Sequence, residues 1–87
     1  MTKMRAKLRV GSVLPFPDGQ GGVAQERVTF HGVAKSDGYP ADGADEDNTY
    51  AKYSPSATLD MVIANPALIG KFAVGDKFYV DFTPADQ

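Results

Sequence analysis

Residues 3–10 read KMRAKLRV, and the strict alternation of charged and apolar side chains in this stretch decides the fold class. The charged side chains occupy every second position: Lys3, Arg5, Lys7 and Arg9. The apolar side chains lie between them: Met4, Ala6, Leu8 and Val10. Because a strand turns successive side chains to opposite faces, whereas a helix would scatter these charges around its axis, the stretch predicts a half-buried β-strand. We expect it to continue to Leu14, with a bend or bulge at Gly11.

Three further segments alternate in the same way and are predicted as strands: residues 25–35 (QERVTFHGVAK), 57–64 (ATLDMVIA) and 77–83 (KFYVDFT). The turn-forming residues of 15–22, PFPDGQGG, predict a hairpin between the first two strands. Residues 65–70, NPALIG, suit one short helical turn, with Asn65 capping its start and Gly70 ending it.

These elements predict a single small all-β domain over residues 1–87, folded as an antiparallel β-barrel or β-sandwich with one short helical turn. A single sheet would leave one side of its apolar residues exposed, and a barrel or a second layer closes the core better. A chain of 87 residues buries only roughly 60–65% of its unfolded surface. Since cysteine is absent, disulfides and thiolate metal sites are excluded, and partner subunits are the remaining source of extra stability.

The long loop at 36–55 is strongly acidic in its first part. Residues 36–50, SDGYPADGADEDNTY, contain five carboxylates and no base. Such a segment is typical of a solvated loop, of a loop that docks on a partner, or of a site for a hard cation such as calcium. The spacing does not fit the twelve-residue EF-hand pattern. We expect residues 37–49 to be mobile in the isolated protein and ordered in an assembly.

The candidate partner-binding residues come from this loop and from the basic first strand. Tyrosine is favoured where one end of a ring is dry and the other wet, as at interfaces. Opposite charges on one protomer can dock head to tail on a neighbouring copy, or neutralise each other within one copy. The predicted set is Tyr39, Asp42, Asp45, Asp47, Tyr50, Tyr53, Lys3, Arg5, Lys7 and Arg9.

The sequence supports catalysis, membrane insertion and nucleic-acid binding less than it supports partner binding. The only histidine, His31, has no recognisable nucleophile or orienting acid, and we expect no enzymatic activity and no cofactor. No apolar run approaches the roughly 20 residues that a membrane span needs. The basic strand and the tyrosines suggest a small barrel that binds single-stranded nucleic acid as an alternative, which a pI near 5.1 and the acidic loop disfavour.

Three segments carry a resemblance: MRAKLRVGSV at 4–13, TYAKYSPSATLDMVIANPA at 49–67 and KFYVDFTPA at 77–85. They resemble small structural proteins from the virions of tailed bacteriophages. The resemblance implies a capsid decoration or cement protein, which binds the major capsid protein and neighbouring copies of itself on the capsid surface. The implied location is the virion, after assembly in the host cytoplasm. A tail or connector protein is the alternative within the virion.

Overall fold

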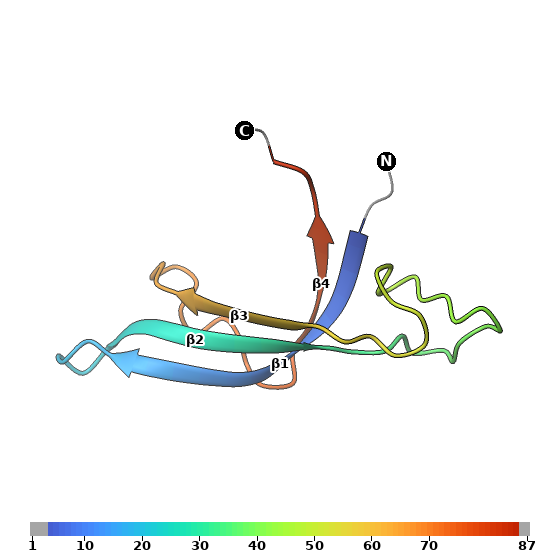
Figure 1. Cartoon of the computed structure of the whole chain (residues 1–87). Coiled ribbons are helices and arrows are strands. Elements are labelled where there is room, and N and C mark those ends of the chain that lie inside the picture. Colours follow the sequence, from blue (N-terminus) through green and yellow to red (C-terminus); the bar gives the residue numbers. More distant parts are fainter. Residues whose placement is uncertain (1–3, 86–87) are drawn as a thin grey trace.

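The computed structural model describes residues 4–85, and they form one four-stranded antiparallel sheet. Its strands are β1 (Met4–Pro17), β2 (Val23–Gly32), β3 (Thr58–Ile63) and β4 (Lys77–Phe82). Their order across the sheet is β3-β2-β1-β4. The all-β, antiparallel prediction is confirmed, and so is the hairpin between the first two strands. The barrel or sandwich is not confirmed, because the sheet of the described residues is open (Figure 1).

β1 bends near its middle and so joins two differently directed parts of the sheet (Figure 1). Its first part, Met4 to Arg9, pairs with β4, and its second part continues along β2. The register against β2 shifts between Val10 and Ser12, which confirms the irregularity predicted at Gly11. Glycine suits this position because an added Cβ would lie 2.5 Å from the ring of His31.

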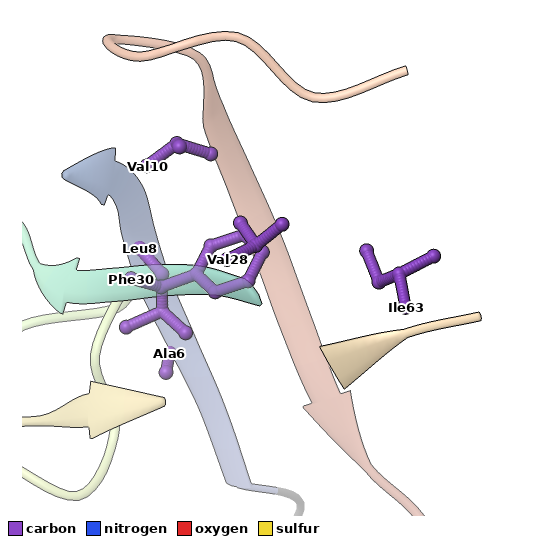
Figure 2. Packing of buried hydrophobic residues seen from close by; sticks show 6 residues of the cluster. All are labelled: Ala6, Leu8, Val10, Val28, Phe30 and Ile63. Carbon is purple, nitrogen blue, oxygen red and sulfur yellow. The ribbon is translucent and has the colours of Figure 1, made fainter. Parts of the chain in front are cut away.

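The core lies on one face of the sheet, where the alternation of residues 3–10 predicts it. Its buried members are Ala6, Leu8 and Val10 on β1, Val28 and Phe30 on β2, and Ile63 on β3 (Figure 2). Phe72, from the connection between β3 and β4, packs edge-on against Phe30 with ring centroids 5.9 Å apart. This connection therefore covers part of the apolar face.

The connection at 64–76 begins with hydrogen-bonded turns where a short helical turn was predicted. The side-chain oxygen of Asn65 accepts a hydrogen bond from the N–H of Ala67 at 3.0 Å, as expected of a capping residue. The N–H of Gly70 donates instead to Oε1 of the buried Glu26 at 2.9 Å. The backbone is thus held by a carboxylate of β2. Within residues 4–85 there is no helix with the length and apolarity needed to cross a membrane.

Candidate functional site

The acidic loop lies along β1 at the point where β2 has ended. β2 stops at Gly32, so within residues 4–85 no strand pairs with the first residues of β1 on that edge. The N–H of Lys7 donates to the side-chain Oδ1 of Asn48 at 2.8 Å. The N–H of Thr49 donates to the carbonyl of Arg5 at 3.0 Å, and the N–H of Arg5 donates to Oγ1 of Thr49 at 2.9 Å. The loop therefore completes the sheet edge with two of its own residues.

Two polar residues of the loop are buried and organise it from inside. Asn48 is 0% exposed, and its Nδ2 donates to the carbonyl of Val33 at 2.7 Å. Asp45 is 5% exposed, and its Oδ1 accepts hydrogen bonds from the N–H groups of Asp47 and Asn48, each at 3.0 Å. Asp45, a predicted partner-binding residue, thus presents little surface to a partner. Asn48 is not among the site residues that the sequence predicts. The Asp-x-x-Asn spacing, which suits a side-chain-to-backbone hydrogen bond three residues on, is the signal that could have indicated it.

The basic strand and the acidic loop meet within a single chain. Nζ of Lys7 lies 3.5 Å from Oδ2 of Asp47, and both side chains are more than four-fifths buried. The hydroxyl of Tyr79 donates to Oδ1 of Asp47 at 3.3 Å. The sequence left open whether these charges neutralise each other within one copy or bind another copy, and for Lys7 and Asp47 the structure shows the first arrangement.

Arg5 forms an ion pair with Asp81 on the same face of the sheet as Lys7. Its Nε lies 2.6 Å from Oδ1 of Asp81, and its guanidinium lies 4.8 Å from the centre of the Tyr79 ring. The hydrogen bond that Arg5 donates to Asp81 and the charge of that carboxylate raise the pKa of Arg5. Arg9 is exposed. Lys3 lies outside the described residues.

Two tyrosines of the loop, Tyr39 and Tyr53, pack against each other. The rings of Tyr39 and Tyr53 pack edge-to-face with centroids 5.9 Å apart. Burial, together with the nearby charge of Asp45, raises the pKa of Tyr39. Tyr53 remains 51% exposed, while its hydroxyl donates to the carbonyl of Ala41 at 2.6 Å. Its ring covers Gly43, where an added Cβ would lie 2.5 Å from Cε2 of Tyr53.

A hollow of about 490 Å³ lies over the loop, and Asp42, Glu46 and Lys52 are among the residues that line it. Asp42 is exposed and accepts a hydrogen bond from the N–H of Ala44 at 3.0 Å. Lys35 reaches Glu46 at 2.8 Å, and this contact lowers the pKa of the Glu46 carboxyl. Among the residues that the structure describes, no group of three or more His, Cys, Asp or Glu side chains is placed to hold a metal ion.

The most distinctive surface is an apolar groove of about 410 Å³ on the same face as the core. It lies between the first part of β1, β4 and the start of β3, and the tyrosine that closes the acidic stretch also lines it. Several large apolar side chains in it are exposed: Phe82 by 51%, Met4 by 41% and Tyr50 by 37%. Leu59 and Val80 line the groove more deeply and are half-buried. We name these five residues the groove residues.

The groove brings one candidate residue, Tyr50, together with residues that the sequence analysis assigned to a closed core. Met4, Leu59 and Phe82 carry the alternating pattern of buried strand positions, and nothing in that pattern tells how many layers cover them. Exposed apolar side chains gathered on one face mark surfaces that associate with other molecules. Comparison of the chain with protein-family models, with curated protein sequences and with solved structures gave no match.

Proposed function

We propose that this protein is a non-enzymatic assembly module that uses the apolar groove to bind a partner subunit. The groove is the single observation that carries the proposal. Its side chains are exposed on the face that also holds the core, and covering them would remove apolar surface from water at a gain of roughly 25 cal/mol per Å². A partner seated there would supply the second layer that the sequence predicts, so that the sandwich would be completed by association.

The setting that we propose is the virion of a tailed bacteriophage, where the protein acts as a capsid decoration or cement protein. The resemblance of residues 4–13, 49–67 and 77–85 supports this setting, and all three segments contribute residues to the groove. The partners are the major capsid protein and neighbouring copies of the chain. In such a lattice many copies bind at once, and modest contacts add up to a stable shell.

The acidic loop has an orienting role in this proposal. Its residues 45–49 are tied to β1, so the loop reaches the partner as a fixed projection beside the groove. Asp42 and Tyr53 are its exposed candidates, and Tyr50 joins the loop to the groove itself. Charged groups at the rim of an interface contribute chiefly to the rate and the specificity of association.

The alternative function, single-stranded nucleic-acid binding, is less well supported than partner binding, because two basic residues of the sheet are paired with acids. Lys7 pairs with Asp47, and Arg5 pairs with Asp81. A phosphate backbone would have to compete with these carboxylates for the same cations.

The test is binding to expanded shells assembled from the major capsid protein alone, measured by co-sedimentation. Phe82→Glu places a charge in the groove at a half-exposed position, where we expect it to leave the fold intact. The matched control is Leu14→Glu, which is 54% exposed and lies across from Arg27, on the opposite face of the sheet. We expect Leu14→Glu to bind as the wild type and Phe82→Glu to bind at least about tenfold more weakly.

Circular dichroism of both variants confirms that they remain folded. Wild-type protein that ignores the shells contradicts the capsid assignment. If the wild type binds and Phe82→Glu binds equally well, the groove is not the docking surface. Binding to purified tails or connectors in place of shells would move the protein to that part of the virion.

A further inference from the structure

β4 is the last strand of the sheet, and its outer edge has no strand beyond it among residues 4–85. The N–H and C=O groups of successive residues point to opposite edges of a strand. Lys7 directs its N–H to Asn48 on the loop side of β1, so the neighbouring Ala6 directs its groups towards β4, where it faces Val80 in the register. The backbone N–H and C=O groups of Val80 therefore point to β1, and those of Tyr79 point to the outer edge of β4.

The residues of β4 whose backbone N–H and C=O groups point to the outer edge are Lys77, Tyr79 and Asp81. Their charges are complementary to those of a second, antiparallel copy of the same strand. If two copies of β4 pair in antiparallel fashion with Tyr79 opposite Tyr79, Lys77 of each copy faces Asp81 of the other. Such directly opposed residues exchange both of their N–H···O bonds. On the core face of the sheet, the same register places Phe78 opposite Val80 of the second copy.

We propose that two copies of this chain associate through the outer edges of their β4 strands, in this register, to form one continuous antiparallel sheet. The oppositely charged pairs argue for this register over its neighbours. A shift by two residues in either direction places Lys77 opposite Tyr79 or Thr83 and removes both charge pairs. Parallel pairing in register would place Lys77 opposite Lys77, and like charges directly opposite each other destabilise a sheet.

The other edge strand lacks this complementarity. β3, with the sequence TLDMVI, carries Asp60 as its single charged residue, so no antiparallel self-pairing of β3 can match opposite charges. Charged residues on an edge strand usually prevent pairing with another chain. On β4 the two charges have opposite signs and lie symmetrically about Tyr79. In an antiparallel pair of β4 strands they therefore attract each other and favour pairing.

Asp81 can serve both its own chain and a second copy. Its carboxylate is held by Arg5 at 2.6 Å, and its side chain is still 57% exposed. Lys77 of the second copy would bring a further cation to this carboxylate. The contact between Phe78 and Val80 would also bring the two apolar grooves next to each other, since Val80 lines the groove. The dimer would then offer a partner two adjoining grooves related by a two-fold axis.

The test is sedimentation velocity of the full chain over a concentration series, with charge variants of β4. Lys77→Glu alone creates two repulsive pairs with Asp81, and Asp81→Lys alone creates two repulsive pairs with Lys77. When these two variants are mixed, every pair in the mixed dimer has opposite charges again. The control is Lys71→Glu, the same change of charge at an exposed position before β4.

We expect a concentration-dependent dimer of the wild-type chain and of Lys71→Glu, with the mass of two 9.3 kDa chains. Each single β4 variant should have a dimer dissociation constant about tenfold higher, and the mixture should recover the wild-type value. A wild type that stays monomeric overturns the proposal, as does a dimer that Lys77→Glu leaves unchanged. Failure of the mixture to recover overturns the register. Since no capsid shell is present, these outcomes are independent of the proposed function.

Discussion

Oδ1 of Asn48 accepts a hydrogen bond from the backbone N–H of Lys7 at 2.8 Å, so a loop side chain continues the sheet where a strand has stopped. The same amide donates from Nδ2 to the carbonyl of Val33 at 2.7 Å. An amide suits this place because it offers an acceptor and a donor in one plane. The acidic loop is therefore part of the folded unit, and its exposed residues project from a fixed base.

Replacing Asn48 should destabilise the fold more than replacing an exposed asparagine. Asn48→Ala leaves the N–H of Lys7 and the carbonyl of Val33 without their partner in a buried place, at a cost of about 2–3 kcal/mol. Asn65→Ala is the control, because Asn65 is exposed and its side chain accepts a hydrogen bond from the N–H of Ala67 in a surface turn. Urea unfolding followed by circular dichroism measures both variants. Equal midpoints for Asn48→Ala and the wild type would show that the loop does not support the sheet.

Hydrogen exchange should divide the acidic loop into two parts in the isolated protein. The N–H of Asn48 donates to Asp45 and that of Thr49 to the carbonyl of Arg5, so both amides should exchange slowly. We expect the amides of residues 37–39 to exchange fast in the free protein and to become protected on capsid shells. This narrows the mobile region that the sequence predicts over 37–49. Exchange of Asn48 and Thr49 at the rate of an unfolded chain would contradict the anchored loop.

Gly43→Ala should destabilise the fold more than Gly19→Ala, because only at Gly43 would the added Cβ meet other atoms. Gly43 has φ of +76° and would place a Cβ 2.5 Å from the Tyr53 ring. Gly19 has φ of +84° and no atom within 4 Å of an added Cβ, which makes Gly19→Ala the matched control. Both variants lose about 1 kcal/mol from the backbone, and Gly43→Ala should lose a further 1–2 kcal/mol, roughly, from the clash.

The double variant Gly43→Ala with Tyr53→Ala separates the two contributions. Removing the ring should relieve the clash, so the two substitutions together should cost less than the sum of their separate effects. Thermal unfolding of the four proteins completes the cycle. Strict additivity would mean that the ring of Tyr53 does not cover Gly43.

The Arg27–Asp60 pair predicts a pH dependence with a definite sign. Nε of Arg27 donates to Oδ1 of Asp60 at 2.9 Å, and this hydrogen bond lowers the pKa of the Asp60 carboxyl below its ordinary value of 3.8. A carboxyl whose pKa is lower in the folded state adds stability above the unfolded pKa. That contribution is lost as the pH falls through the folded pKa, so it disappears only below about pH 4.

An NMR titration of the Asp60 carboxyl carbon measures this effect directly. Arg27→Gln should return the pKa of Asp60 towards 3.8, while Arg9→Gln, an exposed arginine on β1, should leave it lowered. If Asp60 of the wild type titrates at its ordinary value, the pair does not persist in solution.

The strands could be predicted from the sequence because a period of two is a local property of the chain. Ala6, Leu8 and Val10 are buried as the alternation requires, and they share one core with Val28 and Phe30 of β2. The closure of the sheet could not be predicted in this way. Whether Phe82 is covered depends on how many layers the chain can supply, and the alternation of a strand is the same in an open sheet and in a barrel.

The role of the acidic loop depends on contacts between distant residues. Asn48 stands in a run of acids that is typical of solvated segments, and it is buried because β2 ends early and leaves an edge of β1 to be filled. The pairing of Lys7 with Asp47, 40 positions along the chain, depends on the same return of the loop. The charge pattern indicated that basic strand and acidic loop attract each other, and only the topology decides that they meet in one protomer.

We propose that the open apolar face is completed by subunits of a virion. Quantitative mass spectrometry of gradient-purified particles tests it most directly, by comparing the amount of this chain with that of the major capsid protein. We expect many copies of the chain on each particle, in a fixed ratio to the capsid subunits. If infected cells contain the chain but the purified particles lack it, the protein is not a virion subunit and the proposal fails.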